Sequence, residues 1–296
     1  MTKLTNLTEL AAAPLLRLSR RQVLQAVALA PLAASAATAS RFDAEDPRSL
    51  LRAFRALRYS LTEEPVYWWM RVSKHGLIDG RLTHLYDMEI ATLFRARDRG
   101  DETFSVTSLE LIYSIDPVTG ELLDTLRNPY TGETLPWNHT PVGPASVEYS
   151  LQGLELPGSL PGVRIQMEHS LTSGMVQDGR VWLKDDNSAV VTQESGDDPP
   201  FLVTDWSTYL GSVADLENPA LLTLPCTVSF QSTTSWQKPM RMGRRPGSMI
   251  SRGAGAKVER YAQLPGRVRA YIEQLHPEIA RDPAAALDRN PYRFEK

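Results

Sequence analysis

The chain has 296 residues, a formal net charge of −3, and 32 Lys and Arg residues that are dispersed along it. This distribution excludes the basic patch that is typical of nucleic-acid-binding proteins. The single cysteine, Cys226, excludes an intramolecular disulfide and a multi-thiolate metal site. We interpret it as a small buried apolar residue.

The first 39 residues have the layout of a twin-arginine (Tat) export signal. The Arg20-Arg21 pair is followed by a moderately apolar run at 23–37, and small residues ending at Ala39 fit a cleavage site. The run is shorter than the about 20 residues of a membrane-spanning helix. We therefore expect the Tat translocase to export a folded protein to the periplasm, without a stable membrane anchor. The alternative is an amphipathic helix that stays attached.

Residues 40–296 are expected to form one domain that begins with a helix at 46–58. Asp46 can cap this helix, and Pro47 suits its first turn. Period-two alternation and turn residues then predict a series of strands. Their ranges are 66–72, 81–96, 103–115, 122–127, 146–152, 163–171, 180–184, 189–194 and 201–205.

Many strands without crossover helices indicate a mainly β protein with an antiparallel sheet. A sheet of this size avoids exposed edges by closing into a barrel, so we predict a calycin- or lipocalin-like barrel with flanking N- and C-terminal helices. A β-sandwich is the alternative. Short helices are expected at 207–217, 265–275 and 282–287, the last two outside the barrel or across one end.

The residues at 243–261 combine several glycines with Arg244, Arg245, Arg252 and Lys257. We interpret this segment as a structural loop, and the alternative is a loop that cradles an anion with its backbone N–H groups. The spacing fits neither a phosphate-binding loop of nucleotide hydrolases nor a dinucleotide-binding motif. Arg252 is the member of this segment that we single out for a site.

Candidate catalytic residues are His84, Tyr86, His169 and Arg252. The two histidines occupy the apolar faces of their predicted strands and are expected to point into the lumen, where acid–base chemistry would also use a carboxylate such as Asp87, Glu110 or Glu148. Histidines that are hydrogen-bonded within a core are the alternative. Candidate substrate-binding residues are Trp69, Tyr113, His139, Trp182 and Trp236.

No metal or cofactor motif is present, and none is expected to bind. His84, His139 and His169 could in principle form a three-histidine metal site, but no closely spaced pair of histidines supports one.

Several segments together resemble a known bacterial family. They are the Asn-Pro-Tyr-Thr-Gly-Glu turn at 128–133, Trp236, the stretch 247–253 and the closing residues Tyr271-Ile272 and His276-Pro277-Glu278. The chain resembles, over about 49–278, the family catalogued as domain of unknown function 1838. That name implies no activity and no site residues. We associate the resemblance with the breakdown of lignin-derived aromatics, in which cofactor-free lyases release a hydroxymethyl group as formaldehyde.

Three hypotheses follow. The first is a cofactor-independent lyase that acts on a hydroxylated aromatic small molecule. The second is a non-catalytic periplasmic carrier of an apolar or aromatic ligand, because both functions need an apolar cavity with a few polar groups. The third is a structural or partner-binding barrel with a filled core. The sequence leaves the oligomeric state and the natural substrate open.

Overall fold

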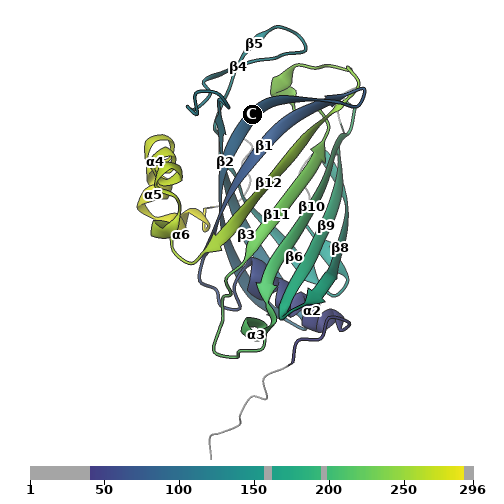
Figure 1. Cartoon of the computed structure of the whole chain (residues 1–296), viewed down its shortest axis with the longest axis vertical. Coiled ribbons are helices and arrows are strands. Elements are labelled where there is room, and N and C mark those ends of the chain that lie inside the picture. The colour runs from purple at the N-terminus through teal and green to yellow at the C-terminus, as the bar shows by residue number, and fades with distance from the viewer. Residues whose placement is uncertain (1–40, 157–161, 195–198, 290–296) are drawn as a thin grey trace, which may run out of the picture. The chain divides into compact units, whose positions relative to one another are not determined.

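The computed structural model describes residues 41–156, 162–194 and 199–289 (Figure 1). The predicted export signal lies outside these residues. These described residues belong to one compact unit.

A ten-stranded antiparallel sheet curls into a nearly closed barrel (Figure 1). The strand order is β7-β6-β3-β2-β1-β12-β11-β10-β9-β8, and β7 also contacts β8, which brings the two edges of the sheet together. The strands are β1 (Val66–Ile78), β2 (Arg81–Gly100), β3 (Thr103–Ile115), β6 (Val142–Ser150), β7 (Gly153–Glu155), β8 (Val163–Gln177), β9 (Arg180–Gln193), β10 (Phe201–Ser212), β11 (Thr227–Thr234) and β12 (Ser248–Val258). The predicted antiparallel barrel is confirmed.

Strand β4 (Thr125–Arg127) and strand β5 (Thr134–Pro136) form a separate hairpin near one end of the barrel (Figure 1). The 3₁₀ helix η1 (Lys238–Met240) contacts β5, and a second 3₁₀ helix, η2 (Tyr261–Gln263), follows β12. We refer to the end that carries the β4–β5 hairpin as the upper end.

Helix α2 (Pro47–Arg58) closes the lower end of the barrel, and its N-terminus is capped by Asp46 as predicted. Phe54 and Leu57 are fully buried in a core that also contains inward residues of several strands. A Cβ atom on Gly211 of β10 would lie 2.3 Å from a Leu57 methyl group, so glycine lets the helix approach this strand closely.

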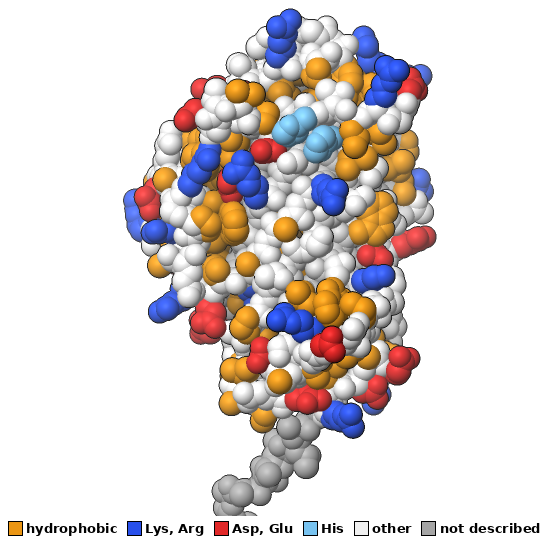
Figure 2. Space-filling model, in the orientation of Figure 1, with side chains coloured by type: hydrophobic (Ala, Val, Ile, Leu, Met, Phe, Trp, Pro, Cys, Tyr) orange, Lys and Arg blue, Asp and Glu red, His pale blue; other side chains and the backbone are white. Residues whose placement is uncertain are grey.

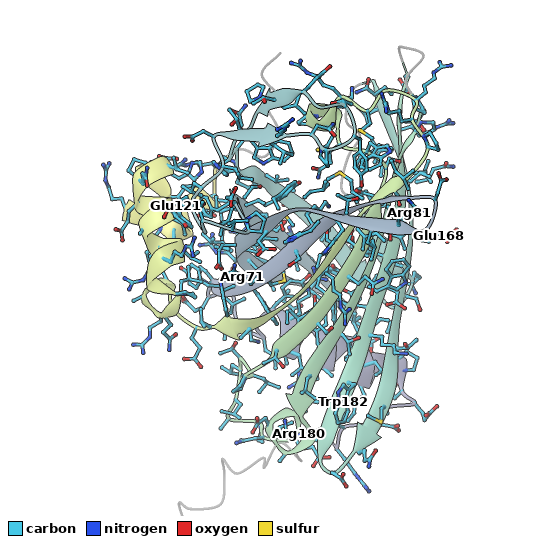
Figure 3. The ribbon with its side chains drawn as sticks, turned by 45° about the horizontal axis from the view of Figure 1, so that its top comes forward. Arg71, Arg81, Glu121, Glu168, Arg180 and Trp182 are labelled. Atoms are coloured by element: carbon cyan, nitrogen blue, oxygen red, sulfur yellow. The ribbon has the colours of Figure 1, made fainter. Side chains whose placement is uncertain are left out.

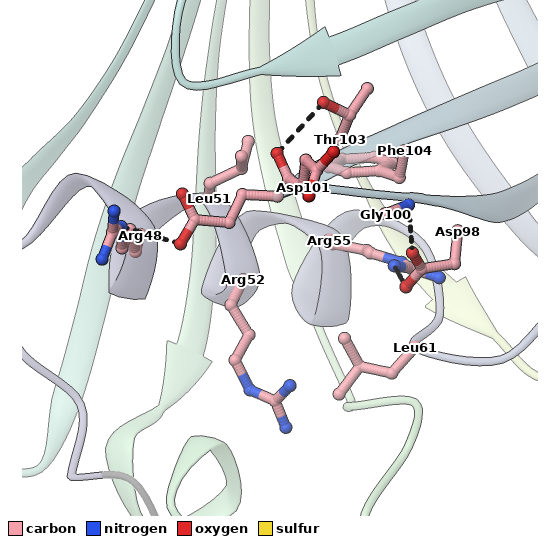
Figure 4. Close-up of a pocket in the computed structure, with 11 residues that line it drawn as sticks. Arg48, Leu51, Arg52, Arg55, Leu61, Asp98, Gly100, Asp101, Thr103 and Phe104 are labelled. Atoms are coloured by element: carbon pink, nitrogen blue, oxygen red, sulfur yellow. Dashed lines mark hydrogen bonds and ion pairs between the residues drawn. The ribbon is translucent and has the colours of Figure 1, made fainter.

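Ion pairs hold the outer side of α2 against the turn between β2 and β3, where a pocket of about 300 Å³ lies (Figure 4). Arg48 contacts Glu102 over 2.7 Å, and Arg55 contacts Asp98 over 2.8 Å. Both acidic side chains are largely exposed, so these pairs orient the helix and stabilise it little.

The helices α4 (Gly266–Leu275), α5 (Pro277–Arg281) and α6 (Pro283–Ala286) pack against the outside of the barrel (Figure 1). Val268 and Ile272 of α4 share a buried core with outward residues of β2 and β3, among them Leu93 and Leu111. The predicted C-terminal helices are therefore confirmed. Because helices cover them, β2 and β3 are apolar on both faces.

The predicted helix at 207–217 is wrong, since β10 continues to Ser212 and only α3 (Val213–Leu216) is helical. Ser207, Tyr209 and Gly211 are buried while Thr208 and Leu210 between them are less buried, so the period of two persists. Because Ser207 and Gly211 on the inward face are polar or small, the sequence lacks the apolar alternation that would have predicted this part of the strand.

The glycine-rich basic segment is not a loop, because most of it forms β12, a central strand between β1 and β11. A Cβ atom on Gly253 would lie 2.3 Å from the Arg71 carbonyl oxygen, and one on Gly255 would lie 2.1 Å from that of Trp69. These glycines therefore allow the close approach of β1 and β12, which is a known role of glycine within barrel strands. Both the structural loop that we favoured and the anion-cradling loop that was its alternative are therefore wrong for residues 248–258.

Among the described residues, no helix has the length and apolar character needed to cross a membrane.

Candidate functional site

A line of polar side chains crosses the inner wall of the barrel. Each member is the direct sheet partner of the next, on seven consecutive strands from β8 to β2. The members, in this order, are His169, Asn187, Asp205, Ser232, Ser251, Lys74 and Tyr86. We call this set the polar belt. Because partners in register point to the same face, all seven side chains face the interior.

Lys74 is the cation of the polar belt. Its side chain is buried, and Nζ donates a hydrogen bond to Ser251 Oγ over 2.7 Å. Burial lowers the pKa of Lys74 to about 8, although Asp205 and Glu110 oppose the shift. The ammonium group can therefore give up a proton near neutral pH, which an exposed lysine does not do.

Glu110 of β3 faces the same interior and is coupled electrostatically to Asp205, Arg58 and Lys74. Burial, followed by the charge of Asp205, raises the pKa of Glu110 to about 7. Burial also raises the pKa of Asp205, partly offset by a hydrogen bond from Ser232. A carboxyl group that titrates near neutrality and is electrostatically coupled to a lysine with a lowered pKa is an arrangement suited to proton transfer.

Arg58, the last residue of α2, enters the interior from below and pairs with Asp185 of β9. The Arg58 guanidinium lies 5.2–5.6 Å from the ring centroids of four aromatic residues, Phe54, Tyr59, Phe94 and Tyr209. Such cation–π contacts stabilise a desolvated guanidinium.

Asp185 also contacts His169. The Asp185 side chain is 1% exposed, and the carboxylate oxygen that does not contact Arg58 lies 2.8 Å from His169 Nε2.

Burial of the inward side chains differs along the barrel. Around α2 the inward side chains are fully buried, whereas higher up the inward residues of β8, β9 and β10 stay partly accessible. Examples are Ile165, Met167, Ala189 and Val203. Glu110 and Asp205 are also only half-buried by area, although both lie well inside the barrel. Inward side chains next to the polar belt therefore keep accessible surface.

An apolar cluster rich in methionine adjoins the polar belt on the β1–β2–β12 side. Met88, Met240, Met242 and Met249 are buried there, and Trp137 and Trp236 pack against the group. Tyr86 contacts Trp137 at 5.1 Å between ring centroids, and its hydroxyl donates to Gln237 over 3.4 Å. Methionine and tryptophan supply an adaptable apolar wall.

Tyr86 and His169 lie on the inner face, as predicted, and both belong to the polar belt. His169 is almost fully buried (5% exposed) against Phe54 and Tyr149, so it orients Asp185 rather than facing open space. The alternative reading, a hydrogen-bonded core histidine, fits its burial.

The expected inward position of His84 is wrong. The register pairs Lys74 with Tyr86 and His75 with His84, so Leu85 is an extra residue that reverses the face of His84. The His84 side chain is 40% exposed, stacks on His75 with ring centroids 4.9 Å apart, and lies 2.9 Å from Asp87 Oδ1. Figure 2 shows an adjacent pair of histidines on the outer surface.

The positions of Arg252, Trp69 and Trp182 also differ from the prediction. Arg252 is exposed on the outer face of β12, next to Ser73 in the register. Trp69 and Trp182 line a groove on the outer wall instead of a lumenal cavity (Trp182 is labelled in Figure 3). The side chains of both strands alternate as expected, but the two tryptophans point outward and not into the lumen.

The three remaining candidate residues, Tyr113, His139 and Trp236, make contacts that stabilise the fold. Tyr113 is buried beneath the C-terminal helices, and its ring contacts that of Tyr271 in a tilted arrangement with the centroids 5.4 Å apart. The imidazole of His139 accepts the Ser114 N–H at 3.3 Å and lies 3.1 Å from the Leu123 carbonyl, so it fixes a loop. The Trp236 indole donates to the Pro246 carbonyl at the upper end over 3.4 Å.

The sequence analysis missed Arg58, Lys74, Asp185 and Asp205. Lys74 continues the inward alternation of Trp68, Met70 and Val72, which would have identified it. Arg58 follows Phe54 by four residues on the same helical face.

No three His, Cys, Asp or Glu side chains of the described residues are placed to hold a metal ion. The three-histidine site considered from the sequence is excluded, because His84, His139 and His169 lie in separate parts of the barrel. Cys226 is buried, and burial raises the pKa of its thiol to about 12, so it has no nucleophilic character.

A family model described as "Protein of unknown function (DUF1838)" matches residues 63–292. No curated protein and no solved structure matches the chain. The matched region includes Lys74, Glu110, Asp185 and Asp205 but not helix α2.

Proposed function

The chain belongs to the family described as protein of unknown function (DUF1838), and since that description assigns no activity, we propose a function from the chemistry of the barrel interior. The protein is an enzyme that binds a hydroxylated aromatic small molecule in the lumen and cleaves a carbon–carbon bond by acid–base catalysis with its own side chains.

The observation that carries the proposal is the electrostatic coupling of Glu110 with Lys74 inside the barrel. Their pKa values are about 7 and about 8, so between these pH values Glu110 is mostly ionised and Lys74 mostly protonated. These are the forms of a general base and a general acid. Buried polar groups with a purely structural role are usually fully hydrogen-bonded within the protein. The Glu110 side chain instead keeps accessible surface, so a ligand can reach it.

The reaction that we propose is a retro-aldol-type cleavage of a hydroxymethyl substituent. Glu110 removes the hydroxyl proton, the carbon–carbon bond breaks, and formaldehyde leaves. The electron pair remains on the carbon attached to the aromatic ring, and Lys74 protonates that carbon. No oxidant or reductant is needed, because the O–H electron pair forms the C=O bond of formaldehyde and the electron pair of the broken carbon–carbon bond is protonated in the other product.

The lining of the lumen supports an aromatic substrate. Tyr86 and the methionine-rich cluster form a buried apolar group next to the polar belt, and the half-buried Trp137 packs against it. A ligand with a flat apolar body and a few hydroxyl groups matches this combination.

The test is incubation of the protein with a panel of lignin-derived dimers that carry a hydroxymethyl group. Substrate loss and formaldehyde release are measured together. We expect one equivalent of formaldehyde per substrate consumed. Substrate loss without formaldehyde would contradict the cleavage chemistry, and absence of any turnover would contradict an enzyme for this substrate class.

A carrier is the second candidate, and the methionine-rich cluster favours it. Flexible methionine side chains adapt to ligands of varied shape without acting on them. Tight binding of a dimer in the lumen, measured by calorimetry and without conversion of the ligand, would support the carrier over the enzyme.

We also propose that the protein works in the periplasm after Tat export, on the basis of the signal-like residues 1–39. Replacement of Arg20 and Arg21 by lysine is expected to leave the protein in the cytoplasmic fraction. Unchanged periplasmic recovery of this variant would contradict the route.

A further inference from the structure

A groove of about 590 Å³ runs along the outer wall of the barrel, on the side opposite to the polar belt. It crosses β1, β12, β11, β10 and β9, and its lining includes Trp69, Arg71, Trp182, Ser229, Ala254 and Ala256. We call it the outer groove. Its volume falls within the range of small-molecule sites.

Small side chains on two neighbouring strands form the floor of the outer groove. On β11 these are Thr227 and Ser229, and on β12 they are Ala254 and Ala256. Thr227 is the sheet partner of Ala256, and Ser229 is the partner of Ala254, so the four form one shallow surface. The floor offers methyl groups and two hydroxyls, without a charge.

Two tryptophans flank this floor from opposite sides. On one side, Trp69 of β1 is the sheet partner of Ala256 of β12. On the other side, Trp182 of β9 is the sheet partner of Leu210 of β10. Four strand-to-strand steps separate them, which corresponds to about 19 Å along the sheet. The Trp69 indole N–H donates to Glu89 over 2.6 Å, which holds that ring in place. A ligand that contacts both indoles must be elongated.

The outer groove has little net charge. Among the described residues that line it, Arg71 alone is charged, and its two terminal nitrogens lie 3.2 Å from Glu89 and 3.2 Å from Asp87 (Arg71 is labelled in Figure 3). Arg71 therefore supplies N–H donors whose positive charge is already balanced. This electrostatic character suits a neutral ligand better than an anionic or cationic one.

We propose that the outer groove binds a neutral oligosaccharide of several sugar units. The C–H faces of sugar rings are weakly positive and stack on the electron-rich faces of Trp69 and Trp182. The hydroxyl edges of the sugars bond to Thr227, Ser229 and the remaining donor edge of Arg71. This site is separate from the lumen and does not depend on the reaction proposed for it.

The test is isothermal titration of the full-length folded protein with cellohexaose and chitohexaose, two neutral linear sugar oligomers. We expect at least one of them to bind. Trp182→Ala and Trp69→Ala should each weaken its binding roughly tenfold or more, by the loss of one stacked ring. Ala254→Trp should abolish binding, because an indole would fill the floor.

Trp206→Ala is the matched control. Trp206 is an exposed tryptophan on the neighbouring strand β10, outside the lining of the groove. Glu110→Gln is a second control, since it lies in the lumen, and it should bind sugar as the parent protein does. Circular dichroism of each variant separates loss of a site from loss of the fold.

Failure of both oligomers to bind would overturn the proposal. So would an equal loss of affinity in Trp206→Ala and Trp182→Ala. If a lignin-derived dimer binds in a Trp182-dependent manner and neither sugar does, the ligand class is wrong. If Trp182→Ala instead changes the oligomeric state in analytical ultracentrifugation, the groove is an interface between copies of the chain.

Discussion

Lys74 of β1 and Asp205 of β10 are connected across the inner wall of the barrel by two serines that face each other in the sheet. Lys74 donates to Ser251, and Asp205 accepts from Ser232. Ser232 and Ser251 are direct sheet partners. A buried cation and a half-buried carboxyl group, separated by two intervening strands, thus each bond to one of two serines that are sheet partners, and the two charges interact electrostatically. This arrangement lets a change in one ionisable group alter the pKa of the others.

Replacement of Lys74 by methionine tests that coupling. The Lys74 charge lowers the pKa of Glu110, so its removal should raise that pKa. If Glu110 is the general base, the acid limb of the plot of kcat/KM against pH moves to higher pH. Lys184→Met is the control, because Lys184 is exposed on the outer side of β9. An acid limb that stays in place in Lys74→Met would contradict the coupling.

The stability of the protein should depend on pH through Glu110. Its pKa is about 7 in the folded protein, against an ordinary value of 4.5. Between these values the folded state holds a proton that the unfolded chain has released, so the free energy of unfolding falls as pH rises. Urea unfolding at a series of pH values should show this fall. The fall should be smaller in Glu110→Gln.

Asp101→Asn, an exposed change at the turn between β2 and β3, is the control for this measurement and should follow the parent protein. An equal pH dependence in Glu110→Gln and in the parent would contradict the raised pKa of Glu110.

Lys74 affects the stability in the opposite direction at higher pH. Its pKa is about 8, against an ordinary 10.5, so stability should rise again as pH increases between these values.

Phe54 of α2 should be a major determinant of stability. Its ring is fully buried and contacts Tyr59, Tyr149 and Tyr209 at centroid distances of 5.2–6.0 Å. Phe54→Ala should lower the free energy of unfolding by about 3–5 kcal/mol. Arg52→Ala, on the exposed side of the same helix, should change it by less than about 0.5 kcal/mol. Similar losses in both variants would contradict the role of α2 as the lower closure.

Gly253→Ala tests the close approach of β1 and β12. The new methyl group would lie 2.3 Å from the Arg71 carbonyl oxygen, so the strands must separate. A loss of about 1–3 kcal/mol is expected from overpacking of this kind. Ala254→Ser, at the adjacent outward position, should have little effect. Full stability of Gly253→Ala would show that the two strands can adjust without cost.

Local patterns in the sequence were sufficient to predict the barrel. Alternation in β2, β3 and β8 predicted long strands and placed Tyr86 and His169 on the inner face. The same reasoning failed for His84, because a one-residue bulge at Leu85 reverses the face and leaves no clear signature in the residues around it. It also failed for β12, where glycines that permit close strand contact looked like a flexible loop.

Most of the candidate site could not be read from the sequence. Lys74, Asp205 and Arg58 come from a strand, another strand and a helix that are distant in the chain, and only closure of the barrel brings them together. Their unusual pKa values arise from burial and mutual interaction, which are properties of the fold. Trp69 and Trp182 were assigned to the lumen because an aromatic residue in a strand is equally suited to either face.

Two carboxyl groups on adjacent strands give the most direct test of the claim that the site lies in the lumen. Glu110 of β3 faces the interior, whereas Asp87 of β2 faces outward and pairs with His84 and Arg71. The measurement is kcat/KM for formaldehyde release by Glu110→Gln and by Asp87→Asn. We predict a loss of at least about 100-fold for Glu110→Gln and activity close to that of the parent for Asp87→Asn. Retained activity in Glu110→Gln, with loss of activity in Asp87→Asn, would place the chemistry on the outer face and contradict the account.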